Sequence, residues 1–230
     1  SSPLAPGQRI GIAGAGVLGR LLAWHLSRLA HDVSVFDPAD GPLPAFDGRG
    51  AAGFTAAGML SPLAELDAAE PDVAGRGWHS IPRWAAVAAE MGQRVQPAPQ
   101  VARLGSLMVA HGPDLGTARR VLARLNPSPG SQTPPPRHEP HLLDVQALGQ
   151  LEPALHSSGG PLHAWLLPGE GQILPLQMLP ALCAASPRVR WHWNTRVREV
   201  SPGQLRLEDG SSPRFDLAID AAEALFERSS

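Results

Sequence analysis

The chain has 230 residues and a formal net charge of −2, with 43% hydrophobic and 17% charged residues. This composition is typical of a globular protein with a sizeable core, and the length allows one or two domains. Because basic residues are not in excess, the composition disfavours nucleic acid and anionic membranes as partners, and no run of 18 apolar residues predicts a membrane span.

The first predicted elements form a parallel crossover. Residues 8–13 predict a short buried strand, and leucines at helical spacing predict a helix from residue 17 to about residue 31. Residues 33–37 predict a second strand, which Pro38 ends. A strand, a glycine turn, a helix and a strand within about thirty residues have the length of a β-α-β unit.

The middle of the chain predicts helices separated by irregular segments. Residues 40–53 are rich in proline and glycine and predict a loop, and the small residues of 55–60 predict the start of a short helix. Helices are expected at 77–94 and 115–125, and a strand is expected between them at 103–110. Residues 126–140 contain six prolines, so we expect an exposed connection there.

The last part of the chain is rich in predicted strands. Asp144 is placed to cap a short helix whose inward residues would be Val145, Leu148 and Leu151. A longer helix is expected at 176–185, and strands are expected at 162–167, 171–174, 189–193, 196–201, 205–208 and 215–220. Trp191 and Trp193 alternate with His192, so both indoles should lie on one face of a sheet.

The turn between the first strand and the first helix reads G-x-G-x-x-G: Gly14, Ala15, Gly16, Val17, Leu18 and Gly19. In this context the pattern predicts a dinucleotide site, where Gly14 makes the turn, Gly16 admits a pyrophosphate to the helix N-terminus and Gly19 allows close packing. Asp37 follows Gly16 by 21 residues and would accept hydrogen bonds from a ribose. Its charge disfavours NADP, but the pattern alone does not separate FAD from NAD.

A segment beyond this turn resembles a known family. Ala56, Ala57, Gly58, Met59 and Leu60 resemble the A-A-G-M-L segment of the D-amino-acid oxidase and glycine oxidase superfamily of FAD-dependent oxidoreductases, particularly its glycine-oxidase-like branch. Residues 169–175, 194–200 and 215–221 resemble further segments of that family more loosely. The resemblance extends over residues 8–222.

The resemblance implies FAD as the cofactor and an α/β fold. In this fold a Rossmann-like, doubly wound FAD-binding domain (1–75 and 195–230) carries an inserted α+β substrate domain (76–194). The resemblance adds Ala56, Ala57, Gly58, Met59, Val197 and Ala221 to the cofactor-binding residues of the glycine turn. It also places Met59 in the substrate pocket beside the flavin, although ordinary core packing of this side chain is equally compatible with the sequence.

The family extends beyond the point where this sequence stops. Its members continue through the rest of the substrate domain, which supplies an arginine for the substrate carboxylate, and a glycine-containing turn usually follows the position of Ala221. Residues 222–230 contain no glycine. We therefore expect an incomplete substrate domain, through a natural truncation, a shifted reading frame or a partial chain, and this expectation places the activity of this polypeptide alone in doubt.

The leading functional hypothesis is oxidation of a C–N bond in a small amine or amino acid by hydride transfer to FAD, with possible oligomerisation. The sequence identifies no catalytic residue, and this chemistry requires no strong side-chain base. The alternatives are an NAD-dependent dehydrogenase, an inactive nucleotide-binding remnant, and a flavoprotein modifying tRNA bases, which the charge disfavours.

Other polar residues carry weaker hypotheses. His138 and His141 flank Pro140, which prevents a helical ligand pair, so no metal site is predicted. Glu65 and Glu170 could line a cleft, but solvated surface is the favoured interpretation. The single cysteine, Cys183, is predicted to be a small apolar residue of a helix. One cysteine and an N-terminus without the features of a signal peptide lead us to expect a cytoplasmic protein.

Overall fold

The computed structural model describes residues 7–45, 50–65, 71–125, 139–155 and 162–222. The chain divides into two compact units. The first unit contains residues 1–57, 88–100 and 174–230, and the second contains residues 58–87 and 101–173. Within the described ranges, no helix is long and apolar enough to cross a membrane.

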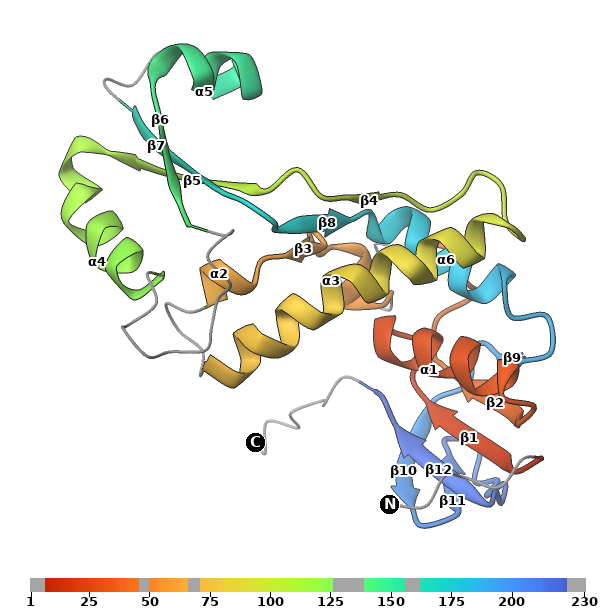
Figure 1. Cartoon of the computed structure of the whole chain (residues 1–230). Helices are drawn as coiled ribbons and strands as arrows, with labels where there is room; N and C mark the ends of the chain where they lie inside the picture. Colours follow the sequence, from red (N-terminus) through yellow and green to blue (C-terminus); the bar gives the residue numbers. More distant parts are fainter. Residues whose placement is uncertain (1–6, 46–49, 66–70, 126–138, 156–161, 223–230) are drawn as a thin grey trace, which may run out of the picture. The chain divides into compact units, whose positions relative to one another are not determined.

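A parallel sheet of four strands, in the order β12-β1-β2-β9, is the centre of the first unit (Figure 1). Its strands are β12 (Leu217–Asp220), β1 (Arg9–Ala13), β2 (Asp32–Phe36) and β9 (Arg190–His192). The crossover from β1 to β2 runs through α1 (Val17–Arg28), which confirms the predicted β-α-β unit. Parallel strands joined through helices define a Rossmann-like α/β fold.

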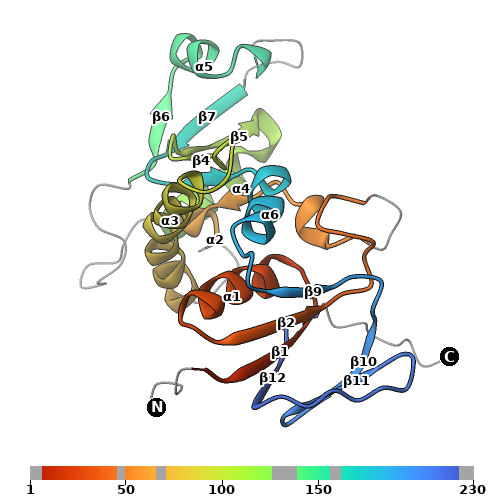
Figure 2. The same cartoon turned by 90° about the vertical axis from the view of Figure 1, so that its right-hand side faces the viewer.

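The two faces of the sheet are covered by different layers, because successive side chains of a strand point to opposite sides. Ile10 and Ile12 face α1, where they form a buried cluster with Val33 and Val35. On the other face, Ala13 packs with residues of the hairpin β10 (Val197–Ser201) and β11 (Gln204–Leu207). Figure 2 shows α1 and this hairpin on opposite sides of the sheet.

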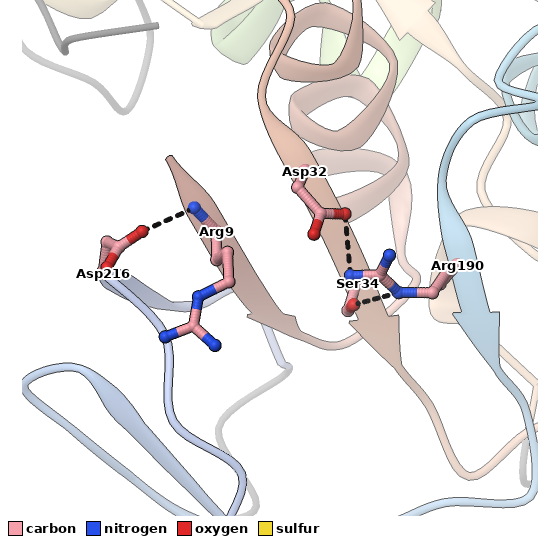
Figure 3. Close-up of polar contacts among 5 residues, drawn as sticks. All are labelled: Arg9, Asp32, Ser34, Arg190 and Asp216. Carbon is pink, nitrogen blue, oxygen red and sulfur yellow. Dashed lines mark hydrogen bonds and ion pairs between the residues drawn. The ribbon is translucent and has the colours of Figure 1, made fainter. Parts of the chain in front are cut away.

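Polar contacts connect neighbouring strands of the sheet in their amino-terminal portions (Figure 3). Arg190 of β9 donates to Ser34 Oγ at 3.2 Å and pairs with Asp32 at 2.7 Å, both on β2. Asp216 accepts a hydrogen bond from the backbone N–H of Arg9 at 2.7 Å. These contacts connect β9 and β12 to the central strands in the register that the ladders show.

The first unit also contains α6 and a short turn of 3-10 helix. α6 (Pro175–Ala184) lies beside α1 (Figure 1), and Cys183 on it is buried as predicted. The 3-10 turn η1 (Ala52–Phe54) packs on α6, where Leu179 lies close to Gly53. The indoles of Trp191 and Trp193 stack with ring centroids 5.6 Å apart, which confirms their common face.

The second unit is α+β, with two small antiparallel sheets. One sheet has the order β3-β8-β4 and the other the order β5-β7-β6. Its strands are β3 (Met59–Leu60), β4 (Val101–Ala102), β5 (Ser106–His111), β6 (His141–Leu143), β7 (Leu162–Leu167) and β8 (Gly171–Ile173). Its helical elements are α2 (Pro62–Glu65), part of α3 (Pro71–Gly92), η2 (Gly112–Asp114), α4 (Leu115–Leu125), α5 (Val145–Leu151) and η3 (Pro153–Leu155).

The segment before Pro62 corrects one sequence prediction. A helix opening at 55–60 is wrong, because Met59 and Leu60 form β3 against β8 and the helix begins only at Pro62. Proline suits a first helical turn, where its missing N–H would have no intrahelical partner.

The helix α5 corrects a second prediction. Asp144 does cap it, accepting the N–H of Ala147 at 2.7 Å, but Val145 and Leu151 are exposed and only Leu148 is buried. A helix of two turns offers one narrow stripe to its neighbours, so the spacing of three apolar residues overstated its buried face.

The division into units also differs from the predicted domain bounds. The predicted substrate domain, 76–194, includes residues 174–194, whereas the first compact unit contains them and β9 among them hydrogen-bonds to β2 inside the parallel sheet. The predicted exposed connection falls mostly at 126–138, outside the described residues.

Leu205 provides a test of the packing between sheet and hairpin. It is fully buried, whereas Leu43 in the same unit is 67% exposed. We expect Leu205→Ala to lower the free energy of unfolding by about 2–5 kcal/mol, since it leaves a cavity in the core. Leu43→Ala should change it by less than about 0.5 kcal/mol. Urea unfolding followed by circular dichroism measures both, and equal effects would contradict this description of the core.

Candidate dinucleotide site

A cavity of about 400 Å³ lies within the first unit, at the carboxyl ends of β1, β2 and β12. In open parallel sheets this edge is where ligands bind. Residues from the glycine turn, the end of β2, the loop before η1, the start of β10 and the end of β12 line it. They are Ala13, Gly14, Gly16, Val17, Leu18, Phe36, Asp37, Pro38, Gly50, Ala51, Ala52, Gly53, Arg196, Val197, Ala221 and Ala222.

The three glycines of the turn meet three different steric conditions. Gly14 has φ +93°, and a Cβ there would lie 2.7 Å from the Cα of Ala222. A Cβ at Gly19 would lie 1.9 Å from the carbonyl oxygen of Gly14, so the helix can approach the turn only without a side chain. A Cβ at Gly16 would meet no protein atom within 4 Å, and Gly16 lines the cavity. The open space above Gly16 fits a close-lying pyrophosphate.

The N-terminus of α1 points its unpaired backbone groups toward this turn. Gly16 is the N-cap and offers no side chain to accept the first N–H groups, and the first turn holds no acidic residue. These N–H groups, together with the helix dipole, favour an anion at this end. The arrangement therefore suits the diphosphate of a dinucleotide.

Asp37 lies at the end of β2 and lines the cavity. Its Oδ2 accepts the N–H of Ala15 at 2.6 Å, and its Oδ1 accepts the N–H of Ala39 at 2.8 Å. Each carboxylate oxygen has a second lone pair, so the group can still accept a ribose hydroxyl. The structure thus gives Asp37 a role in holding the glycine turn, which the sequence pattern did not indicate.

The side chain of Arg20 was not predicted as part of the site. It is 1% exposed and lies in the first turns of α1. Its Nε–H donates to the carbonyl of Ala15 at 2.6 Å, and its Nη1 donates to the carbonyl of Pro42 at 2.8 Å. The guanidinium carbon also lies 5.1 Å from the ring centroid of Phe54 and 5.5 Å from that of Trp193.

Phe36 forms part of the cavity wall and is itself stacked on His192. The two ring centroids are 4.4 Å apart and their planes differ by 6°. Partial burial, and to a smaller extent the charge of Arg190, lower the pKa of His192. The imidazole is therefore neutral at pH 7 and supports Phe36 as an uncharged ring.

The thiol of Cys183 contacts Arg20 from α6. Burial raises the pKa of Cys183 to about 11, and the neighbouring guanidinium opposes this rise only in part. Burial also lowers the pKa of Arg20, while Cys183 and Asp37 counteract that change. At neutral pH the pair is a protonated guanidinium beside an uncharged thiol, so Cys183 supplies no compensating charge.

The structure brings together most, but not all, of the predicted site residues. Those that line the cavity are Gly14, Gly16, Val17, Leu18, Asp37, Val197 and Ala221. Ala15 and Gly19 do not line it, but they fix the turn through the contacts described above.

The A-A-G-M-L segment is divided between the two units. Ala56 and Ala57 are exposed residues of the first unit that do not line the cavity. Gly58 and Met59 belong to the second unit, where Met59 is 54% exposed, so core packing of this side chain is wrong. Contact of these four residues with a flavin, and of Met59 with a substrate, remains a prediction.

Glu170 corrects the expectation of solvated surface. It is fully buried in the second unit, where it accepts the N–H of Leu63 at 2.7 Å and the hydroxyl of Ser106. Its carboxylate therefore connects α2 to β5 by hydrogen bonds. His138 lies outside the described residues, and among those described no group of three or more His, Cys, Asp or Glu could hold a metal ion.

Comparison with known proteins identifies the class. The family of FAD-dependent oxidoreductases called DAO matches residues 9–226, and the chain therefore belongs to it. FAD is accordingly the cofactor that family membership assigns to this chain. No curated protein sequence matches the chain.

Solved structures with the same fold include several oxidases. The chain is similar to glycine oxidase from Geobacillus kaustophilus, with a TM-score of 0.71 and 22% identity over 94% of this chain and 56% of that one. It is also similar to glycine oxidase from Bacillus cereus, with a TM-score of 0.70 and 15% identity over 95% and 56% of the two chains. Iminodiacetate oxidase from Chelativorans gives a TM-score of 0.65 and 22% identity over 92% and 54%. The chain thus spans little more than half the length of these proteins.

The steric condition at Gly19 predicts a severe effect of a single methyl group. We expect Gly19→Ala to lower the free energy of unfolding by roughly 3 kcal/mol or more, because its Cβ would collide with backbone that cannot move without opening the turn. Gly16→Ala, with no protein atom in its way, should stay within about 1 kcal/mol of the parent. Denaturant unfolding measures the free energy of unfolding of both variants. A Gly19→Ala protein as stable as the parent would contradict this close contact.

The raised pKa of Cys183 predicts a loss of stability in alkali. The chain has no tyrosine and all 19 of its basic residues are arginine, so Cys183 is the only side chain that titrates between pH 9 and 11. The unfolded thiol ionises near its ordinary value of 9.0, whereas the folded thiol keeps its proton until about 11. Folding stability is therefore complete below pH 9 and falls as pH rises toward 11, by about 1 kcal/mol at pH 10.

Urea unfolding at pH 8.5 and pH 10 measures this difference. Cys183→Ala removes the titrating group, so its unfolding free energy should be nearly equal at the two pH values. A parent protein as stable at pH 10 as at pH 8.5 would contradict the burial of the thiol.

Proposed function

We propose that this chain supplies the FAD site of an oxidoreductase that oxidises a C–N bond in a small amine or amino acid. The observation that carries the proposal is the cavity at the carboxyl end of the parallel sheet, where an uncapped helix N-terminus and an open Gly16 meet in a member of the FAD-dependent oxidoreductase family. Bound FAD would supply hydride acceptance, while the protein supplies orientation and electrostatics.

The residues of the cavity suit the separate parts of FAD. The N–H groups at the start of α1 would hold the diphosphate beside Gly16, and Asp37 would accept hydrogen bonds from the ribose. The apolar side chains of Val17 and Leu18, which are 38% and 52% exposed, would be covered by the bound cofactor. Ala56, Ala57, Gly58 and Met59 are proposed to approach the flavin, and Val197 and Ala221 to approach the adenosine and diphosphate portions.

The substrate class rests on the chemistry of similar proteins. Two similar structures are glycine oxidases and a third is an iminodiacetate oxidase, all of which act on an amine that also carries a carboxylate. In the proposed reaction, hydride leaves the carbon beside a neutral amine, and the protein needs to orient that carbon rather than to provide a strong base. No catalytic side chain is assigned within this chain.

FAD binding is the first test. The purified protein should quench flavin fluorescence on titration with FAD, and NADH added instead should bind at least tenfold more weakly. Gly16→Ala should fold but bind FAD at least about tenfold more weakly, because its methyl group would occupy the space beside the diphosphate. Gly116→Ala adds a methyl group to α4 where no atom lies within 4 Å, and it should bind FAD like the parent.

The outcomes of this titration separate the cofactors. Tight binding of NADH without FAD binding would favour a dehydrogenase, and binding of neither would contradict the proposal.

The substrate class has its own test. The FAD-loaded protein, in the longest form that its coding frame provides, should lose its flavin absorbance near 450 nm when mixed anaerobically with glycine or with iminodiacetate. The corresponding carboxylic acids without nitrogen serve as controls. Loss of absorbance with a 2-hydroxy acid instead of any amine would contradict the C–N assignment while leaving FAD binding intact.

A further inference from the structure

We infer that Arg20 is a positioning residue of the dinucleotide site, holding the glycine turn and the loop after β2 in the conformation that receives FAD. The inference rests on the proposed FAD site and concerns a side chain that does not line the cavity. Arg20 acts through the residues that do line it.

The first part of this function is a clamp on Ala15. The carbonyl of Ala15 accepts the Nε–H of Arg20 at 2.6 Å, and the N–H of Ala15 donates to Asp37 at 2.6 Å. One residue of the turn is therefore held from both of its polar groups by side chains of opposite charge. Hydrogen bonds to charged groups are stronger than neutral ones, so this peptide segment is tightly oriented. Gly14 and Gly16, on either side of Ala15, both line the cavity.

The second part is a connection to the loop after β2. Nη1 of Arg20 donates to the carbonyl of Pro42 at 2.8 Å, which ties this loop to the first turns of α1. The guanidinium also lies over the ring of Phe54, in the 3-10 turn whose residues Ala52 and Gly53 line the cavity. A single side chain thus connects the glycine turn, the loop after β2 and η1.

The charge of Arg20 is not neutralised by a direct ion pair. Within the described ranges no carboxylate lies within ion-pairing distance of it, and its contacts are two carbonyls, two aromatic faces and the thiol of Cys183. A buried guanidinium in this position costs folding free energy unless something uses it. Helix capping does not explain it, because a cation in the first turn of a helix opposes the helix dipole. The charge of Asp37 raises the pKa of Arg20, and the same carboxylate accepts the N–H of Ala15. The guanidinium and this carboxylate therefore act together on one residue of the turn, which fits a role in positioning it.

The alternative is that Arg20 stabilises the fold without affecting the site. The two interpretations differ in one measurable quantity, the dissociation constant of FAD from the folded protein. A residue that only stabilises the fold would lower the thermal midpoint when replaced, but the protein that remains folded would bind FAD normally. A positioning residue changes the dissociation constant itself.

Arg20→Met keeps the length of the side chain and removes its charge and its donors. We expect the FAD dissociation constant to rise about 10- to 100-fold, measured by flavin fluorescence well below the thermal midpoint of the apoprotein. The matched control is Arg28→Met on the same helix, which loses an exposed arginine that pairs with Glu90 and does not contact the cavity. This control should bind FAD within about twofold of the parent.

Arg20→Lys is the second variant and keeps the charge. One ammonium group cannot reach both carbonyls and lie over Phe54, so FAD should bind about tenfold more weakly. If Arg20→Met does not fold, the FAD dissociation constant of Arg20→Lys provides the test. A dissociation constant equal to that of the parent would overturn the inference.

FAD binding by the parent protein distinguishes a failure of this inference from a failure of the proposed function. Failure of the parent to bind FAD would overturn the proposed function and the inference with it. Binding by the parent, with equal binding by Arg20→Met, would overturn the inference alone. Amide hydrogen exchange of the apoprotein adds a measurement without ligand, in which the peptide that contains Ala15 should exchange faster in Arg20→Met than in Arg28→Met.

Discussion

The close approach of Gly19 to the carbonyl oxygen of Gly14 is the contact on which the site depends. A Cβ at Gly19 would lie 1.9 Å from that oxygen, so α1 can begin directly above the end of β1 only because no side chain intervenes. This approach places the unpaired N–H groups of the helix at the carboxyl edge of the sheet. Every later feature of the cavity, from the open space at Gly16 to the clamp on Ala15, presupposes that position.

The parallel sheet separates structural contacts from functional ones along the strands. At the start and in the middle of β2, Asp32 and Ser34 hold Arg190 of the neighbouring β9. At the carboxyl end, Phe36 and Asp37 face the cavity. The ion pair at the amino end is half-exposed and contributes little free energy by itself, so its effect is to fix the register rather than to stabilise the sheet strongly. Register matters here because a shift of one residue would turn Phe36 away from the cavity.

Much of this arrangement could be predicted from the sequence, because the glycine pattern is a steric requirement expressed in residue types. The β-α-β unit, the placement of Gly14 and Gly16 at the cavity and the position of Asp37 follow from that pattern. The strands at 196–201 and 215–220 were predicted from the sequence pattern, but a place for Val197 and Ala221 in the site was expected only from family resemblance. Both are ordinary apolar residues, and they reach the cavity through backbone topology that local sequence does not encode.

The role of Arg20 could not be predicted, and the reason is physical. An arginine inside a leucine-rich helix is normally exposed, and the helical spacing of the leucines gives no sign of a buried arginine. In the structure Leu18 and Leu29 are more than half exposed, while Arg20, Ala23 and Ser27 are buried at helical spacing. This orientation of the helix depends on contacts with Phe54, Trp193 and Cys183, which are distant in sequence. The same applies to Glu170, whose partners Leu63 and Ser106 come from separate segments.

The cavity lies within one of the two units, and this decides which parts of the chain build it. All sixteen residues that line the cavity belong to the first unit, which is assembled from three separate stretches of sequence. The walls of this cavity therefore come from the glycine turn, the carboxyl ends of the strands, the loop that ends in η1 and the start of the hairpin. The chain spans about 56% of the length of the two glycine oxidases to which it is similar, and a shared fold does not by itself fix the substrate. The cavity that suits a diphosphate and a ribose is thus built within the first unit around the glycine turn, whereas the proposed contacts with the flavin also involve Gly58 and Met59 of the second unit.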